Sequence, residues 1–273
     1  MPEGDTVFRA AGRLDRALSG QRLLRAQMRV PQHATADLVG AEIVGTVPRG
    51  KHLLTRMNVR GQAITLHTHL KMDGVWRVHR AGARWERPAH TARVVLGATG
   101  VEAVGFSLGI VTLLPTDREH EAVGHLGPDL LDPGWGPALR DAAVARLLER
   151  PDRPLRSALL DQSRIAGIGN VFAAELCFLA GQHPLTPMSQ VAEVTGLAGV
   201  VGLVDRAREL LVLNAPRSRR MTTGDERAPL WVYGRAGLPC RRCGTPVRRA
   251  AHGDVRGQER VSDWCPHCQP AAR

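Results

Sequence analysis

Two pairs of cysteines near the C-terminus constrain the fold of this chain more than any other feature. Cys240-x-x-Cys243 and Cys265-x-x-Cys268 are separated by 21 residues, one beyond the usual range for two such knuckles. Four thiolates with this spacing suit a tetrahedral zinc site, and disulfide bonds are the alternative. The N-terminus lacks the basic and then apolar segments of a signal peptide, which disfavours disulfides. We therefore predict one structural Zn²⁺ ion in a small C-terminal module.

The chain is strongly basic, with a net charge of +11 and a pI near 10.9. Residues 217–273 contain twelve arginines against five acidic residues, so the excess is concentrated at one end. No apolar run approaches 18 residues, and no lipidation motif or basic amphipathic helix is present. A solvated basic surface is the alternative, but the pattern favours a nucleic-acid partner, no membrane and a cytoplasmic, nucleoid-associated location.

The segment that spans the two cysteine pairs, residues 240–268, is predicted to form a hairpin that binds phosphates. Its arginines are Arg241, Arg242, Arg248, Arg249, Arg256 and Arg260.

The first residues offer a nucleophile beside a proton donor. Removal of Met1 would leave Pro2 as a free secondary amine next to the carboxylate of Glu3. An α-amino group titrates near pH 8, so a useful fraction is nucleophilic at neutral pH and can attack an aldehyde-like carbon. Asp5 is predicted to cap a helix that ends at Gly20. An extended tail without chemistry is the alternative.

Lysine is almost absent from the chain. All but two of its 37 basic residues are arginine, and the exceptions are Lys51 and Lys71. A chain that otherwise uses arginine can retain lysine where a compact ammonium of adjustable pKa matters, and chance is the alternative. Both lysines are therefore candidate functional residues.

Short strands separated by Gly, Pro or Asn follow the first helix and predict a β-sandwich or barrel. The predicted strands are 22–30, 42–49, 52–59, 63–69, 74–79, 93–97 and 111–114.

The remainder of the chain is predicted to be helical up to the cysteine module. The predicted domains are 1–115 for the β-sandwich, 116–136 for a linker, 137–228 for a helical domain and 229–273 for the zinc module. Between two helices, Gly167 and Gly169 allow close backbone approach, and Asn170 is predicted to cap the second helix. Free N–H groups at such a helix start bind phosphate, whereas an ordinary tight turn is the alternative.

The combination of these motifs resembles the formamidopyrimidine-DNA glycosylase and endonuclease VIII family of base-excision enzymes. The resemblance covers nearly the whole chain in order: P-E-G at 2–4, R-G-K-H-L-L at 49–54, H-L-K-M-D-G at 69–74, A-G-I-G-N-V-F-A-A-E at 166–175, V-Y-G-R-A-G-L-P-C-R-R-C-G at 232–244 and C-P-H-C-Q at 265–269. It implies an α+β multidomain fold, with a β-sandwich behind an N-terminal helix, a helix–two-turn–helix domain and a zinc-finger hairpin.

The resemblance also implies a mechanism. The N-terminal Pro2 would attack the sugar C1′ of a damaged nucleotide, and Glu3 would move protons during base release. Lys51 matches a hairpin lysine that contacts phosphate and supports the chemistry. Release of the base through an iminium would then allow β,δ-elimination, so that one intermediate serves a glycosylase and an AP lyase.

Further residues match the family's DNA contacts. Asn170 matches the asparagine of the helix–two-turn–helix motif, and Arg260 matches the zinc-finger arginine. Met72 matches a residue that fills the gap left by an everted base, an apolar insertion that offsets lost stacking. The other predicted DNA-binding residues are His69, Lys71, Gly167 and Gly169. The partner is therefore predicted to be damaged DNA, bound by a monomer.

The chain departs from the family pattern at three places near the predicted site. Thr6 stands where the family often has glutamate, Lys71 replaces a usual glycine, and the Arg-Arg-Phe wedge of the 8-oxoguanine-directed branch is not found near Phe106. P-E-G and G-V-W at 74–76 resemble endonuclease VIII, so oxidised pyrimidines are the predicted substrates. The alternatives are an oxidised-purine glycosylase and a non-catalytic zinc protein that binds damaged DNA.

Overall fold

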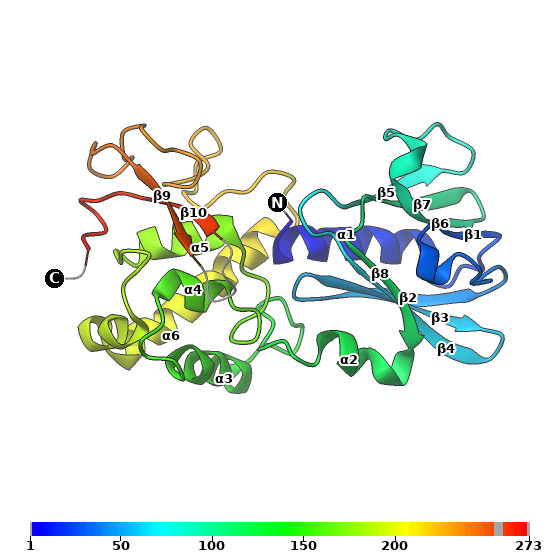
Figure 1. Ribbon diagram of the computed structural model, residues 1–273, viewed down its shortest axis with the longest axis horizontal. Coiled ribbons are helices and arrows are strands. Elements are labelled where there is room, and N and C mark those ends of the chain that lie inside the picture. Colours follow the sequence, from blue (N-terminus) through cyan, green and yellow to red (C-terminus); the bar gives the residue numbers. More distant parts are fainter. Residues whose placement is uncertain (1, 254–258, 272–273) are drawn as a thin grey trace. The chain divides into compact units, whose positions relative to one another are not determined.

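The computed structural model of the protein describes residues 2–253 and 259–271, and of 252, 253, 259 and 260 it describes the backbone only. The chain divides into two compact units, Met1–His125 and Leu126–Arg273 (Figure 1). None of the described helices combines the length and the hydropathy needed to span a bilayer.

The first unit is a sandwich of two four-stranded antiparallel sheets, which confirms the predicted β-sandwich. One sheet has the order β1-β6-β7-β5 and the other β2-β3-β4-β8. The strands are β1 (Arg25–Met28), β2 (Glu42–Arg49), β3 (His52–Val59), β4 (Gln62–His69), β5 (Val75–Arg80), β6 (Ala92–Ala98), β7 (Val101–Phe106) and β8 (Ile110–Pro115), with short 3₁₀ turns η1 (Pro31–His33) and η2 (Ala89–Thr91).

Strand β7 is absent from the sequence prediction. It contains Glu102 and Gly105, residue types that are depleted in strands. Antiparallel neighbours β5 and β6 pair with it on both sides, and Arg25 and the Trp85 indole donate hydrogen bonds to the Glu102 carboxylate. Tertiary pairing thus overrides a weak local preference.

Helix α1 (Gly4–Leu18) packs its apolar stripe into the core of the sandwich. Val7, Ala11, Leu14 and Leu18 recur at helical spacing and are all buried. The predicted cap at Asp5 is wrong. Glu3 occupies the cap position and its carbonyl accepts hydrogen bonds from the next turn, so that Asp5 lies inside the first turn.

The segment that follows β8 contains structure where the sequence predicts a linker. It forms the 3₁₀ turn η3 (Thr116–Arg118) and the short helix α2 (Glu119–Val123). Both Glu119 carboxylate oxygens accept from Arg56 of β3, at 2.8 and 2.7 Å, and Thr65 of β4 donates to one of them at 2.7 Å. These bonds fix the segment on the sheet β2-β3-β4-β8, a partner that its own sequence does not reveal.

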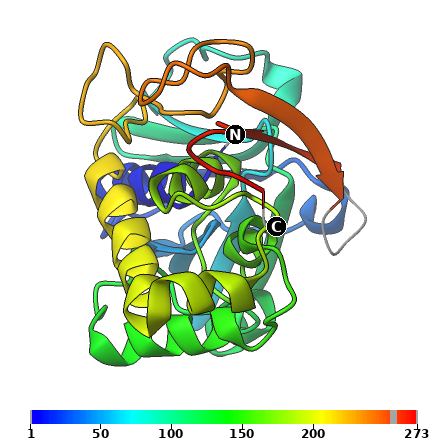
Figure 2. The same cartoon turned by 90° about the vertical axis from the view of Figure 1, so that its left-hand side faces the viewer.

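The second unit is a bundle of four helices and a hairpin. The helices are α3 (Pro137–Leu148), α4 (Leu155–Leu160), α5 (Asn170–Leu179) and α6 (Met188–Asn214), and the hairpin strands are β9 (Arg248–Gly253) and β10 (Glu259–Trp264). Helix α6 is broken at Gly196, where φ is +67°, and Figure 2 shows α6 (yellow) as two segments of different direction. Glycine is the residue that tolerates this φ.

Candidate active site and nucleic-acid interface

The direction of α1 determines where the chain start lies. The Thr46 backbone N–H of β2 donates to the Asp15 carboxylate at 2.9 Å, and the Gly20 N–H donates to the Ile43 carbonyl at 2.8 Å, so α1 and β2 run in opposite directions. From Asp15 back to the helix start is about 16 Å. From Thr46 forward to Lys51 is also about 16 Å. Pro2 and Glu3 therefore lie at the same end of the sandwich as Lys51.

Lys51 lies in the tight turn between β2 and β3. Arg49 pairs with His52 across this turn, which leaves only Gly50 and Lys51 between them. Gly50 has φ of +57°, which a two-residue hairpin turn of this kind requires of its first residue. The turn presents a lysine at the tip of a rigid hairpin, as the resemblance implies.

Glu3 is completely buried at the start of α1, whereas Pro2 is half-buried. The Thr6 hydroxyl, which stands where the family often has glutamate, donates to the Asp5 carboxylate at 3.2 Å. Asp5 is also buried, so a second carboxylate does lie in this turn despite the substitution. The first turn of α1 therefore carries two buried carboxylates, on Glu3 and Asp5.

The loop after β4 places Lys71 and Met72 at this same end, because His69 pairs with His52 in the sheet. The Lys71 backbone N–H donates to His69 Nδ1 at 2.9 Å, and Lys71 has the left-handed φ of +51°. A side chain at Gly109 would meet the Lys71 side chain, since its Cβ would lie 2.1 Å from Lys71 Cγ. Met72 is 62% exposed. The loop thus projects an apolar side chain outward beside a cationic one.

A cluster of four imidazoles lies behind these residues. Only His69 among them is a predicted site residue. His52 Nδ1 and His67 Nε2 are 2.7 Å apart, and the His52 ring centroid lies 4.7 Å from that of His69 and 6.0 Å from that of His125. Side chains alternate along β4, so His67 and His69 lie on the same face of the strand. This spacing is the feature of the sequence that could have indicated the cluster.

Burial lowers the pKa values of three of these imidazoles, those of His52, His67 and His69. Desolvation, followed by the neighbouring imidazoles, lowers the pKa of His52 to about 3. Desolvation, followed by the charges of Lys71 and Lys51, lowers the pKa of His69 to about 4. The charges of both lysines thus disfavour protonation of His69.

We expect the stability of the protein to fall as the pH drops from about 6.5 towards 4. The unfolded state binds protons at these histidines near pH 6.5, whereas the folded state does so only near their lowered pKa values, so the stabilisation is present above 6.5 and is lost on acidification. The check is the unfolding midpoint of wild type and His52→Gln at pH 7.5 and 5. The variant should lose less on acidification, whereas His90→Gln, on exposed η2, should behave as wild type. Equal losses in all three proteins would contradict this assignment.

The turn before α5 carries the predicted phosphate-binding residues of the second unit. Gly167 has φ of +107°, and its N–H donates to the Gln162 amide at 3.1 Å, whereas Gly169 is extended. The predicted cap at Asn170 is wrong, because Gly169 occupies that position and Asn170 is the first helical residue. The Asn170 side chain instead accepts a hydrogen bond from Arg156 at 2.9 Å. The sequence did not indicate that Arg156, a buried residue on another helix, is the partner of this side chain.

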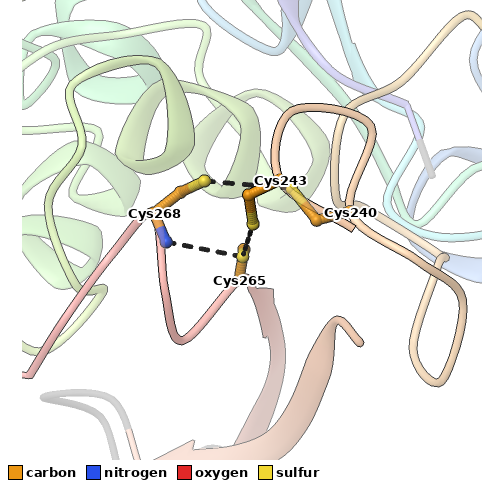
Figure 3. A group of neighbouring side chains, drawn as sticks. All are labelled: Cys240, Cys243, Cys265 and Cys268. Atoms are coloured by element: carbon orange, nitrogen blue, oxygen red, sulfur yellow. Dashed lines mark hydrogen bonds between the residues drawn. The ribbon is translucent and has the colours of Figure 1, made fainter. Parts of the chain in front are cut away.

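The four cysteines form the metal-ligand cluster that their spacing predicts. All four Sγ atoms lie within 4.8 Å of one another. Cys240 and Cys268 Sγ are 3.9 Å apart, and Cys243 and Cys265 Sγ are 3.5 Å apart. Figure 3 shows the side chains of the two knuckles pointing toward one another. Four sulfurs at about 2.3 Å from a tetrahedral zinc would be about 3.8 Å apart, so the donor set fits such an ion.

Glu175 attaches the segment before the first knuckle to α5, a role that the sequence did not reveal. Its carboxylate is fully buried and accepts hydrogen bonds from the backbone N–H groups of Trp231, Val232 and Tyr233 at 2.8 to 2.9 Å, and from the Thr222 hydroxyl. A charge is stable in such a position only when donors surround it. Glu175 lies one turn from Asn170 on the same helix, so it ties the cysteine module to the phosphate-binding turn.

Several hairpin arginines have structural partners. Arg249 forms a bidentate pair with the buried Asp263, at 2.7 and 3.0 Å. The Arg242 guanidinium lies 4.4 Å from the Phe178 ring centroid. The backbone of Arg260 pairs with His252, but its side chain, like the whole of Arg256, lies outside the described residues. The predicted phosphate contacts are thus fewer than the arginine count suggests.

Comparison with known proteins decides the family. Residues 1–107 match the formamidopyrimidine-DNA glycosylase N-terminal domain, and residues 126–201 match the formamidopyrimidine-DNA glycosylase H2TH domain. A probable endonuclease 8 2 of Streptomyces coelicolor is 49% identical, over 100% of this chain and 96% of the relative. The chain belongs to the formamidopyrimidine-DNA glycosylase and endonuclease VIII family.

Other members of the family agree with this assignment. The DNA-(apurinic or apyrimidinic site) lyase Nei2 of Mycolicibacterium smegmatis is 45% identical over the full length of both chains. The fold resembles that of the Lactococcus lactis Fpg protein in complex with abasic-site DNA, with a TM-score of 0.79, 23% identity and coverage of 98% of this chain and 100% of the other. The family fold comprises the sandwich, the H2TH helices and the four-cysteine module described above.

Proposed function

We propose that the protein is a DNA glycosylase and AP lyase of base excision repair in which Pro2 is the nucleophile. The observation that carries this proposal is the common location of Pro2, buried Glu3 and the Lys51 turn at one end of the sandwich. Relatives that match the whole chain are named endonuclease 8 2 and AP lyase. The substrate is therefore damaged DNA.

The reaction begins with attack of the Pro2 nitrogen on C1′ of the damaged nucleotide. The bond between C1′ and the base breaks, and the base leaves with the electron pair and a proton. The sugar ring then opens: the C1′–O4′ bond breaks, O4′ takes a proton, and C1′ becomes an iminium with the Pro2 nitrogen. The iminium acidifies the protons on C2′, so loss of one expels the 3′ phosphate, and a second elimination expels the 5′ phosphate. Glycosylase and lyase activities share this intermediate.

Glu3 and Lys51 support this chemistry in different ways, one by proton transfer and the other by its positive charge. A buried carboxylate beside the amine can accept and return protons during base release and opening of the sugar ring. Lys51, held at the tip of a two-residue turn, is positioned to neutralise a phosphate next to the lesion. His69 and Lys71 extend this cationic edge, and exposed Met72 can fill the space of an everted base.

The connection between β7 and β8 supports oxidised pyrimidines as the preferred substrates. In the 8-oxoguanine-directed branch of the family, an Arg-Arg-Phe wedge is typical near this position. Here, only residues 107–109 join the two strands, Phe106 is fully buried and Leu108 is 7% exposed. None of the described side chains of this turn is an exposed aromatic residue that could act as a wedge. Met72 is therefore the residue that fills the space left by the everted base.

Single-turnover excision from two duplexes tests the substrate preference. One duplex carries thymine glycol and the other 8-oxoguanine opposite cytosine. We expect faster release of thymine glycol. Faster release of 8-oxoguanine would assign the enzyme to the oxidised-purine alternative, and no trapped adduct with either lesion or with abasic DNA would indicate the non-catalytic alternative.

We also propose that the metal held by the four cysteines is one structural Zn²⁺. Its donor set is four thiolates without an open position, and metal binding supplies much of the folding energy of so small a module. Cys268→Ser should therefore lower the zinc content from about one per chain to near zero and weaken DNA binding, while Cys177→Ser, at a buried cysteine outside the cluster, should retain zinc. Metal analysis of freshly purified protein is the measurement, and a metal-free wild type would refute the assignment.

The domain limits 1–115, 116–136, 137–228 and 229–273, the monomeric state and the nucleoid-associated cytoplasmic location stay predictions.

A further inference from the structure

The side chain of Arg156 joins two DNA-binding elements of the second unit. Arg156 lies on α4 and is 2% exposed. Its Nη2 donates to Asn170 Oδ1 at 2.9 Å and to the Val261 carbonyl of β10 at 2.9 Å. These partners are 14 and 105 residues away in sequence, so one guanidinium connects the start of α5 with the zinc-module hairpin.

The first of these bonds determines which way the Asn170 amide faces. A guanidinium has donors but no acceptor, so it can bind only the oxygen of the amide. The Asn170 NH₂ group must therefore face away from Arg156, and none of the described residues accepts a hydrogen bond from it. Phosphate oxygens accept hydrogen bonds but do not donate them, so this is the orientation that a phosphate requires.

The second bond fixes the hairpin relative to the same amide. Val261 follows Arg260 directly on β10 and pairs with Ala251 of β9. Arg156 therefore sets the register between the strand that carries Arg260 and the Asn170 amide. Two phosphate contacts held in a fixed register bind DNA without a further loss of conformational entropy.

Other contacts attach the cysteine module to the helices independently of Arg156. Glu175 binds three backbone N–H groups before the first knuckle, and the Gln269 amide donates to the Gln182 carbonyl at 2.9 Å. Loss of Arg156 would leave these bonds intact. Its effect is then expected on the orientation of the DNA contacts and not on the presence of the folded module.

We infer that Arg156 is a positioning residue for phosphate binding, which orients the Asn170 amide and aligns strand β10 with it. This inference rests on the proposed function, because it requires that Asn170 contacts DNA.

A double-mutant cycle on DNA affinity tests the inference. The proteins are wild type, Arg156→Met, Asn170→Ala and the double variant, and the probe is a duplex with a tetrahydrofuran abasic analogue. Arg156→Met should weaken binding by roughly ten- to a hundredfold, typical of hydrogen bonds to a charged group. The double variant should bind DNA no more weakly than whichever single variant has the lower affinity, because both single changes remove the same contact between the Asn170 amide and DNA. For Arg156→Met, the loss should appear in the enzyme concentration that gives half-maximal cleavage of abasic DNA and not in the cleavage rate at saturating enzyme.

Two further variants separate positioning from general stability. Arg156→Lys retains a donor-only side chain and should recover part of the affinity that Arg156→Met loses. Arg208→Met removes another part-buried guanidinium, which donates to the Leu130 carbonyl in the helical core, and should leave DNA affinity unchanged. Unfolding midpoints and zinc content of all variants provide the comparison.

The outcomes distinguish this inference from the proposed function. If Asn170→Ala leaves affinity unchanged, the proposed DNA contact itself is wrong. If Asn170→Ala weakens binding but the losses of the two variants add, or Arg208→Met loses as much affinity as Arg156→Met, the positioning role of Arg156 is overturned. Should Arg156→Met fail to fold, Arg156→Lys takes its place in the cycle, and additive losses there overturn the inference equally.

Discussion

An N-terminal extension before Pro2 is expected to abolish the covalent DNA adduct. Borohydride reduces an iminium between the Pro2 nitrogen and C1′ to a stable amine, so the adduct survives denaturing electrophoresis. An extension converts that nitrogen into an amide, which has no nucleophilic lone pair and cannot form an iminium. The yield of adduct with abasic or lesion-containing duplex should therefore fall from a major product to background.

The control is the same sequence with its tag after Arg273 and a free N-terminus. Mass spectrometry should show that this protein begins at Pro2, because Met1 is readily removed before a small residue. If the extended protein traps or cleaves abasic DNA at the rate of the control, the nucleophile is another group and the mechanism proposed for Pro2 is wrong.

Glu3→Gln is expected to reduce base excision by a factor on the order of 10² or more, the usual effect of removing a positioned acid or base. The amide has the same shape as the carboxylate but cannot carry protons, and the backbone carbonyl of Glu3 retains its bonds to the first turn of α1. The loss should be smaller on abasic DNA, where no base has to be expelled. Single-turnover rates on both substrates measure this difference.

Glu119→Gln is the matched control for the loss of a carboxylate in the same unit. Glu119 binds Arg56 on the sheet, so this variant should lose some stability but retain near-normal excision. Equal losses for Glu3→Gln on lesion and abasic substrates would instead indicate a binding or structural role for Glu3, and native excision by this variant would exclude it as the proton carrier.

Local sequence determined the features whose cause lies within a few residues. The spacing of Cys240, Cys243, Cys265 and Cys268 predicted the metal-ligand cluster, because each knuckle folds around its own two thiolates. Strands β2 and β3 were predicted with their observed bounds, since a single two-residue turn separates them. The turn itself required Gly50, which placed Lys51 at its tip.

The predicted helix caps were wrong where a polar side chain could form its hydrogen bond in more than one way. Asp5 and Asn170 are both good helix caps by residue type, yet neither takes that position. The Asn170 amide oxygen binds Arg156, and the Asp5 carboxylate accepts from Thr6. At Asn170, a local cap and a tertiary hydrogen bond compete for the amide oxygen, and only the folded chain decides between them.

The sequence by itself determined the order of the elements, the metal-ligand set and the chemistry available at the N-terminus, since these depend on residue type and short spacing. Only the tertiary structure decided which groups meet: α1 runs antiparallel to β2 and so brings Glu3 to the end of the sandwich that bears Lys51. Packing of β4 beside β3 likewise brings His67 and His69 to His52, and burial lowers the pKa values of all three. Such contacts depend on the path of the whole backbone, because each joins residues that are far apart in sequence. The residues next to either one do not indicate which partner it will meet.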